Sequence, residues 1–338
     1  MTALDPSRLS FALSVAVLAA IICAVLIRIL KPWLKRYALA RPNARSSHVV
    51  PTPQGAGIAV IAATLLVAGI SAEVTKLDLQ TTLFASTVFI ALVGFADDIK
   101  PIPELPRLLL QAAAVGAVVF AIPAELRVAP MLPLLVERAV LLIAGLWFVN
   151  LVNFMDGLDL MTAAEVVPVA GALVLFGWRG DLANMPTIIA AALGGAILGF
   201  APFNRPAAKV FLGDVGSLPI GLLLGWCLLQ LALSQHVAAA LLLPLYYLAD
   251  ATLTLLRRMI GGEPFWAAHR SHFYQRATEN GYSVLRVVSE VFVLNLVLAA
   301  LALVSVSVKN AVLEVPCVVA GAAAVALLLR RFSRSASK

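Results

Sequence analysis

Charged residues are scarce in this chain. Asp, Glu, Lys and Arg make up 13% of its residues, whereas they make up roughly 25% of a soluble domain. Hydrophobic residues account for 62% of the 338 residues, and the mean hydropathy is +0.97. So little polar surface cannot cover a water-facing globule of this length. The composition excludes a nucleic-acid-binding domain, a secreted disulfide scaffold and a disordered tail, and it indicates a polytopic membrane protein.

Cysteine is also rare. Cys23, Cys227 and Cys317 all lie in apolar stretches, and none has a neighbour at the spacing of a metal-binding or redox motif. We therefore expect all three to be small packing residues rather than ligands or redox groups.

Long apolar runs fill most of the chain. A helix needs about 20 apolar residues to cross the hydrocarbon core, whereas a spanning β-barrel would show alternating segments of about ten residues. The runs are continuous and rich in Ala and Leu, so they predict an all-α fold in a single integral membrane domain, residues 1–338. Eleven runs are candidate spans, with ten as the alternative count: residues 9–30, 57–72, 79–96, 105–122, 134–152, 160–178, 186–203, 215–234, 237–256, 283–308 and 310–329.

The basic residues favour one orientation. With the N-terminus outside and eleven spans, 19 Lys and Arg residues fall on the inner side and six on the outer side. Because Lys and Arg are enriched in cytoplasmic loops, we predict a periplasmic N-terminus and a cytoplasmic C-terminus. Nearly all Asp, Asn and His residues of chemical interest fall in the inner loops, which makes the cytoplasmic face the predicted working face. These loops cover about 31–56, 97–107, 153–160, 203–217 and 257–282.

Two inner segments are rich in carboxylates and amides. Asp97 and Asp98 end one span, and adjacent helical residues point about 100° apart, so one could approach a metal–phosphate centre and the other an acceptor. In the next segment, polar residues at every third position predict one stripe on a helix that Gly157 ends. The stripe consists of Asn150, Asn153, Asp156 and Asp159. Such oxygen-rich groups suit Mg²⁺, and a hydrated or capped helix end is the simpler alternative for each segment.

A third inner segment, residues 204–217, ends in a Gly-Asp-Val-Gly-Ser string. Gly213 and Gly216 allow close backbone approach beside Asp214. Ser217 falls near the start of the next span, where the amide dipoles of a helix favour anions. An ordinary loop with an N-cap is the alternative interpretation.

The fourth segment, residues 269–276, carries two of the four histidines together with two arginines. No Cys or Glu is placed as a further ligand, which argues against a zinc site. A cationic clamp for phosphate suits the forked donors of Arg. A basic loop at anionic lipid headgroups is the alternative.

In this order, the four segments resemble the motifs of the polyprenyl-phosphate N-acetylhexosamine-1-phosphate transferases, glycosyltransferase family 4, over roughly residues 41–280. The string from His269 to Arg276 looks most like the members that start lipopolysaccharide O-antigen. The resemblance implies transfer of a sugar 1-phosphate, expected to be an N-acetylated hexosamine, from a UDP-sugar to undecaprenyl phosphate, with release of UMP. It implies Mg²⁺, or Mn²⁺ as the alternative cofactor, and a site on the cytoplasmic face of the bacterial inner membrane. Membrane lipids and a second copy of the chain in a homodimer are the other expected partners, and nucleic acid is not expected.

The resemblance also implies roles for individual residues. Asp98, with Asp97 beside it, is the expected catalytic base for the lipid phosphate, or a nucleophile in an alternative mechanism. Asn153 and Asp214 match the metal ligands. Uridine binding is expected at Asp159, Phe211 as the stacking ring, Gly157, Asn204 and Asp156. Phosphate or sugar binding is expected at Arg107, which matches the cation for the lipid phosphate, and at Lys209, His269, Arg270 and His272.

The chain departs from the family pattern at three places, where Ala56, Leu160 and the pair Arg270-Ser271 stand. These departures concern the identity of the sugar more than the reaction. The residues leave open whether transfer is direct or passes through an aspartyl intermediate. A secondary transporter with acidic ion-coupling residues is the alternative function, although its site would lie near the bilayer midplane rather than at helix ends.

Overall fold

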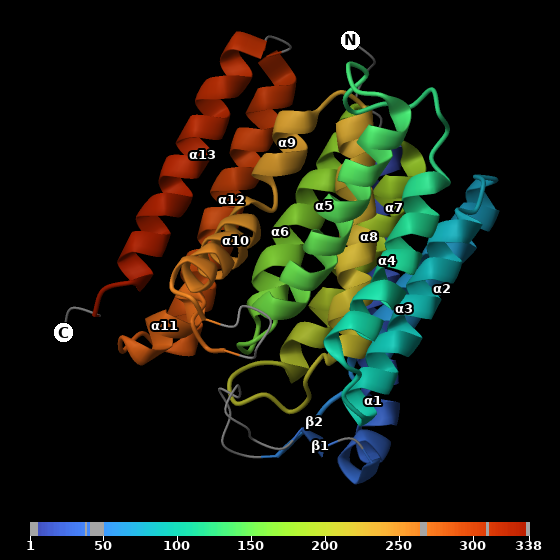
Figure 1. Ribbon diagram of the computed structural model, residues 1–338. Helices are drawn as coiled ribbons and strands as arrows, with labels where there is room; N and C mark the ends of the chain where they lie inside the picture. Colours follow the sequence, from blue (N-terminus) through green and yellow to red (C-terminus); the bar gives the residue numbers. More distant parts are fainter. Residues whose placement is uncertain (1–5, 38, 41–50, 264–268, 309–310, 336–338) are drawn as a thin grey trace.

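The computed structural model describes residues 6–37, 39–40, 51–263, 269–308 and 311–335, and Figure 1 shows helices packed side by side along one common direction. The helices are α1 (Pro6–Tyr37), α2 (Gly57–Thr75), α3 (Thr81–Ile99), α4 (Glu104–Phe120), α5 (Leu134–Met155), α6 (Met161–Arg179), α7 (Asn184–Phe200), the 3₁₀ turn η1 (Ala201–Phe203), α8 (Asp214–Leu233), α9 (Val237–Leu242), α10 (Leu245–Ile260), α11 (Phe273–Glu279), α12 (Val284–Val308) and α13 (Ala311–Phe332).

Nine of the described helices are long and apolar enough to cross a membrane: α1, α2, α3, α5, α6, α7, α8, α12 and α13. The chain is therefore a helical, multi-pass membrane protein, as its composition predicts. The fourth predicted span is α4, which has 17 residues. The count of eleven crossings and the orientation in the membrane stay predictions.

The ninth predicted span, residues 237–256, is not one helix. It is divided into α9 and α10, with Leu243 and Pro244 between them. Proline lacks a backbone N–H, and its ring clashes with the carbonyl four residues earlier, so a continuous helix is interrupted there. Pro244 instead occupies the N-cap position of α10, and this second helix carries the chain toward the polar end of the bundle.

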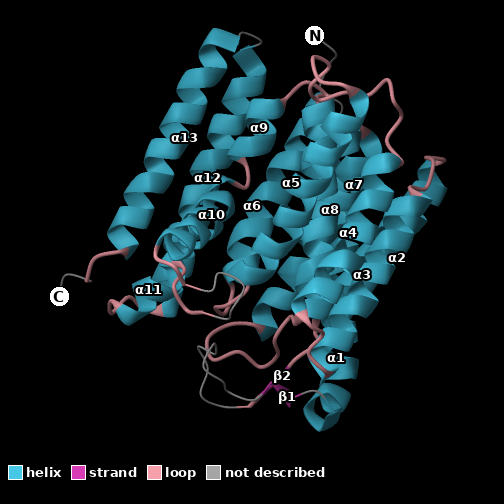
Figure 2. Cartoon of the chain, viewed as in Figure 1, coloured by secondary structure: helices cyan, strands magenta, loops and turns pink. Residues whose placement is uncertain are grey.

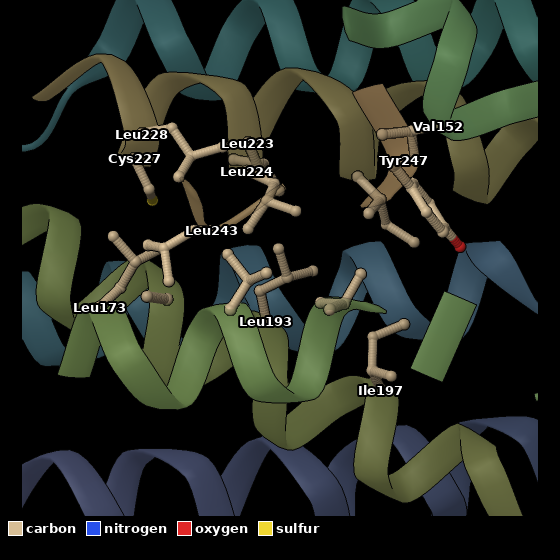
Figure 3. Packing of buried hydrophobic residues seen from close by; sticks show 14 of the residues in the cluster. Val152, Leu173, Leu193, Ile197, Leu223, Leu224, Cys227, Leu228, Leu243 and Tyr247 are labelled. Carbon is tan, nitrogen blue, oxygen red and sulfur yellow. The ribbon is translucent and has the colours of Figure 1, made fainter. Parts of the chain in front are cut away.

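The interior of the bundle is apolar. Helices α6, α7 and α8 are the most buried of the candidate spans. In the most apolar stretch of each, 78–83% of the residues are buried. Figure 3 shows side chains from these helices meeting in the core, among them Leu173, Leu193 and Leu223. Cys23, Cys227 and Cys317 are buried and unpaired, which confirms that they are packing residues.

Loops lie mainly at the two ends of the bundle, as the colouring in Figure 2 shows. At the lower end in this view, β1 (Leu39–Ala40) pairs antiparallel with β2 (Thr52–Pro53). Two residues per strand give no readable alternation, which explains why the sequence does not predict them. Of the predicted inner loop 31–56, residues 31–37 continue α1, and residues 38 and 41–50 lie outside the described residues. The two chain ends lie at opposite ends of the bundle (Figure 1), as an odd number of crossings requires.

Candidate active site

The four polar segments meet at one end of the bundle. The end of α3 contacts the start of α8 through Asp98, and the end of α5 contacts it through Asn153. The 156–160 loop contacts the 204–213 loop through Asp159, and α11 contacts the end of α5 through Tyr274. Segments up to about 120 residues apart in sequence therefore form one polar cluster, which we call the inner-end cluster.

Asp98 holds the start of α8. Its Oδ1 accepts a hydrogen bond from the backbone N–H of Asp214 at 2.9 Å, and its Oδ2 accepts one from Val215 at 3.0 Å. The side-chain amide of Gln54 also donates to Oδ1. The first N–H groups of a helix have no partner within the helix, so a carboxylate there satisfies them and suits the helix dipole.

Asp97 has other hydrogen-bond partners than Asp98. Its Oδ1 accepts a hydrogen bond from the backbone of Ile102 at 2.6 Å, and its Oδ2 forms an ion pair with Arg107 at 3.0 Å. The two adjacent carboxylates thus have different hydrogen-bond partners, although both lie near the carboxylate of Asp214. Arg107, which the resemblance implies as the cation for the lipid phosphate, is tied here to the end of α3.

Asp214 lies at the centre of the inner-end cluster. The side-chain amide of Asn153 donates to Asp214 Oδ1 and to Ser217 Oγ, both at 2.8 Å. Asp97 and Asp98 both lie near enough to interact electrostatically with the carboxylate of Asp214. The two residues that the sequence pairs as metal ligands, Asn153 and Asp214, are thus in direct contact.

The predicted polar stripe is wrong in part. Helix α5 ends at Met155, and residues 156–160 form a loop, because Gly and Asp are weak helix formers. Asp156 and Asp159 therefore leave the helical face that Asn153 occupies. Asn150 turns away from the inner-end cluster and donates to Gln111 of α4 at 2.7 Å.

Asp156 is a carboxyl group with a raised pKa. Burial raises the pKa of this carboxyl to about 7. A hydrogen bond from the Thr162 hydroxyl opposes the increase in pKa, and the charges of Asp98 and Asp159 add to it. The inner-end cluster therefore contains a carboxyl group that can gain or lose a proton near physiological pH.

Residues expected to bind uridine lie on two loops that are bonded to each other. Buried Asn204 accepts from the backbone N–H of Leu160 at 2.7 Å and donates to the carbonyl of Val210 at 3.1 Å. Asp159 accepts from the backbone N–H of Ala208 at 3.1 Å. Asn204 thus links the two loops, a structural role that is separate from its expected role in uridine binding.

The segment 51–57 lies against the third polar segment. The N–H of Phe211 donates to the carbonyl of Pro53 at 2.8 Å, and the carbonyl of Phe211 accepts from Gly55 and Ala56. The ring of Phe211 is half-buried, and Lys209 is exposed on the same loop. This Pro- and Gly-rich segment is therefore held against the third polar segment by backbone hydrogen bonds.

The fourth polar segment packs on the end of α5. The hydroxyl of Tyr274 donates to the carbonyl of Phe154 at 2.9 Å. A Cβ at Gly157 would overlap that hydroxyl, so any side chain there would displace Tyr274. His269 and His272 stack with ring centres 4.9 Å apart, and Arg270 is half-buried beside them.

Two residues of the inner-end cluster are absent from the sequence-based predictions. Gln54 carries no sequence signal of its own. Asp250 sits in an apolar helix, and that intramembrane carboxylate is a signal that could have identified it. Glu165 carries the same signal, but it is buried and accepts from Asn295 at 2.7 Å, which makes it a link between α6 and α12.

The donor set suits a hard cation. Among the described residues, no three His, Cys, Asp or Glu side chains are arranged to hold a metal ion. Mg²⁺ does not need such a cage, because it binds one or two protein carboxylates together with waters and substrate phosphates. Asp97, Asp98 and Asp214 converge, and only Asp97 has a guanidinium beside it. The oxygens of Asp214 and Asn153 therefore fit Mg²⁺.

Comparison with known proteins gives the family. Residues 80–232 match the model of glycosyl transferase family 4. The decaprenyl-phosphate N-acetylglucosaminephosphotransferase of Mycobacterium tuberculosis (strain H37Rv) is 30% identical over 87% of this chain and 83% of its own length. The probable undecaprenyl-phosphate N-acetylglucosaminyl 1-phosphate transferase of Bacillus subtilis is 27% identical over 79% of this chain and 78% of its own.

The phospho-N-acetylmuramoyl-pentapeptide-transferase of Rickettsia africae is 25% identical over 84% of this chain and 88% of its own length. The family model covers the first three polar segments, and the relatives match over most of the chain rather than over a single motif. The chain belongs to glycosyl transferase family 4 and is a membrane phosphotransferase.

Proposed function

We propose that the protein transfers an N-acetylhexosamine 1-phosphate from a UDP-sugar to a polyprenyl phosphate such as undecaprenyl phosphate, with release of UMP. The meeting of Asp98, Asn153 and Asp214 at one end of the bundle carries this proposal. The names of the relatives support the substrates, since they specify polyprenyl phosphates and N-acetylated sugars.

The location of the inner-end cluster suits these two substrates. The donor is soluble, whereas the acceptor has a tail that stays in the bilayer, so the two can react only at a membrane surface. The inner-end cluster lies where the spanning helices α3, α5 and α8 begin or end. The distribution of Lys and Arg supports the proposal that this end lies on the cytoplasmic side of the inner membrane.

Asp98 is the proposed base at the acceptor. A carboxylate has about four lone-pair positions, and three donors already contact Asp98. One position therefore remains to orient the phosphate oxygen or to take its proton. Because a lipid phosphate is largely ionised near neutral pH, orientation contributes more than proton removal.

Asp214 and Asn153 are the proposed ligands of Mg²⁺, with Mn²⁺ as the alternative. The bound cation would offset the repulsion between two anionic reactants. Asp98 fixes the first residues of α8 and so holds Asp214 in place. Asn153 adds a second constraint from α5.

The remaining contacts divide between the two parts of the donor. The loops at 157–160 and 204–211 are proposed to bind uridine through Asp159 and the ring of Phe211, with Gly157, Asn204 and Asp156 close by. The phosphates and sugar of the donor are proposed to meet Lys209, His269, Arg270 and His272, whereas Arg107 is the proposed cation for the lipid phosphate of the acceptor. Arg and His donors suit charge on a transferring phosphoryl group.

Initiation of O-antigen or a related cell-envelope polysaccharide is the proposed pathway, and a homodimer is the proposed assembly. To test the reaction, the purified protein in lipid vesicles would be given undecaprenyl phosphate and a panel of UDP-linked GlcNAc, GalNAc, FucNAc and QuiNAc. We expect one of these sugars to yield a lipid heavier by the sugar phosphate, together with UMP.

Asp214→Ala and Asp98→Asn should abolish the product. Asp78→Asn is the matched control, because this exposed carboxylate precedes α3 at the end of the bundle opposite Asp98. Near-normal turnover by Asp214→Ala would refute the site. Uptake of a labelled solute into vesicles without any lipid product would favour the transporter instead.

A further inference from the structure

Helix α10 carries a fully buried carboxylate. Asp250 is 0% exposed in the packed bundle. A buried charge is costly unless hydrogen-bond donors surround it. The hydrogen-bond donors around Asp250 therefore indicate its role.

Five donors converge on Asp250. Two are hydroxyl groups on its own helix, and three belong to the polar segment that begins α11. The donors are Tyr246 Oη at 3.2 Å, Thr254 Oγ1 at 3.3 Å, His272 Nδ1 at 3.2 Å, and the backbone N–H groups of Phe273 at 3.0 Å and Tyr274 at 3.1 Å. One side chain thus fixes three consecutive residues of the fourth polar segment.

The contact with His272 sets the position of its protons. A carboxylate only accepts hydrogen bonds, so the ring must carry a proton on Nδ1. The ring is also stacked against His269 at 4.9 Å and Tyr274 at 5.7 Å between centres. With Nδ1 engaged and the ring plane fixed, Nε2 is the nitrogen that can meet a substrate.

The same segment is attached to the site. The hydroxyl of Tyr274 donates to the carbonyl of Phe154, and the rings of Phe154 and His272 are 6.4 Å apart. Phe154 directly follows Asn153, a proposed metal ligand. A displacement of His272 relative to α5 would therefore change its distance from the reacting phosphates.

We propose that Asp250 is the positioning residue for His272. It holds the Nδ1-protonated ring in one orientation and directs Nε2 toward the phosphates or sugar of the donor. The proposal depends on the proposed role of His272 in donor binding, and Asp250 itself does not touch the substrate. Partners that orient a functional imidazole in this way typically contribute about 10- to 100-fold to activity.

Nitrogen NMR of ¹⁵N-histidine-labelled protein tests the geometry without any activity. The chain has four histidines, and the spectrum of His272→Gln assigns the signal of His272. We expect a proton on Nδ1 in the unaltered protein, whether the ring is neutral or charged. In Asp250→Asn, the amide would donate to Nδ1 and move the proton of the neutral ring to Nε2. An unprotonated Nδ1 in the unaltered protein would overturn the proposal.

A double-mutant cycle tests the function. Asp250→Asn should lower kcat by about 10- to 100-fold, and it should have little further effect when His272 is already Gln, because both changes remove the same contribution. If the fold losses in kcat of the two single variants multiply in the double variant, Asp250 acts independently of His272 and the proposal is refuted. Melting temperatures report whether each variant folds. If Asp250→Asn does not fold, the NMR spectrum of the unaltered protein still tests whether Nδ1 of His272 carries the proton.

Thr254→Val is the matched control. It removes another hydrogen bond to the same carboxylate and leaves the contact with His272 in place, so kcat should stay near that of the unaltered protein. A loss as large as that of Asp250→Asn would indicate a merely structural role for the carboxylate. If the unaltered protein transfers no sugar phosphate at all, the proposed function fails, while the NMR measurement still decides how Asp250 holds His272.

Discussion

Gly94 of α3 packs directly against the backbone at the start of α8, and Gly94→Ala is the sharpest test of how the site is held. A Cβ at this position would lie 2.7 Å from the backbone nitrogen of Val215 and closer still to the carbonyl of Asp214. Non-bonded heavy atoms prefer about 3.5 Å or more. The start of α8 would therefore have to move by roughly 0.8 Å or more.

This displacement has two measurable effects. Overpacking typically costs about 1–3 kcal/mol, which the better helix propensity of Ala, about 1 kcal/mol, offsets only in part. A shift of about 1 Å in a positioned group can cost about 100-fold in rate, and Gly94→Ala displaces the backbone of Asp214 itself. We expect a lower melting temperature together with a loss of transfer approaching that size.

Gly171→Ala is the matched control for Gly94→Ala. Gly171 lies within α6 and has no atom within 4 Å of the position where a Cβ would stand. This variant should keep its transfer rate and keep or slightly raise its melting temperature, because the helix propensity of Ala meets no clash there. Equal rates and equal melting temperatures for the two variants would refute the view that close packing at Gly94 places Asp214.

Three further outcomes follow from the site. Folding raises the pKa of Asp156 to about 7 from 3.8, so the folded protein loses stability as pH rises from 4 to 7. At pH 8, Asp156→Asn should therefore be more stable than the unaltered protein by up to about 4 kcal/mol. Its advantage in denaturation experiments should shrink at pH 5. Removal of divalent cations by chelation should stop sugar-phosphate transfer, and added Mg²⁺ should restore it. Arg107→Gln should raise KM for the lipid acceptor more than KM for the UDP-sugar in steady-state assays.

Each outcome has a clear contrary result. An advantage of Asp156→Asn that is the same at pH 5 and pH 8 would show that burial does not alter the titration of this carboxyl. Full activity after thorough chelation would remove Mg²⁺ from the proposal. A larger effect of Arg107→Gln on the UDP-sugar would move this cation from the acceptor to the donor.

Local pattern predicts the helices and the four motifs well. Apolar runs of about 20 residues have one stable form in a bilayer, so length and hydropathy suffice to locate α1, α5 or α12. The convergence of Asp98 with Asp214 was predictable only because both end up on the same side of the membrane. Which atoms they contact was not, since that depends on how closely α3 and α8 pack.

The errors share a physical cause. The three-residue spacing of Asn150 and Asn153 suggests a common face, yet the first bonds to α4 and the second to α8. The hold of Asp250 on His272 joins residues 22 positions apart in the chain. The interruption at Pro244 is the exception, because the missing N–H of proline is a local property of the sequence. Sequence spacing reports which residues share an element, whereas the partner of each side chain is decided by helix packing.

The position of Asp98 at the start of α8 bears on how the phosphate bond is exchanged. If its carboxylate were esterified by a phosphoryl group, the oxygen used would stop serving as an anionic acceptor for Asp214 or Val215. Leaving such an N–H without its acceptor would cost the protein about 1–3 kcal/mol, during the step in which the first residue of α8 has to stay in place. Attack of the lipid phosphate on the donor without a covalent enzyme adduct avoids that loss, so the fold favours a single in-line exchange.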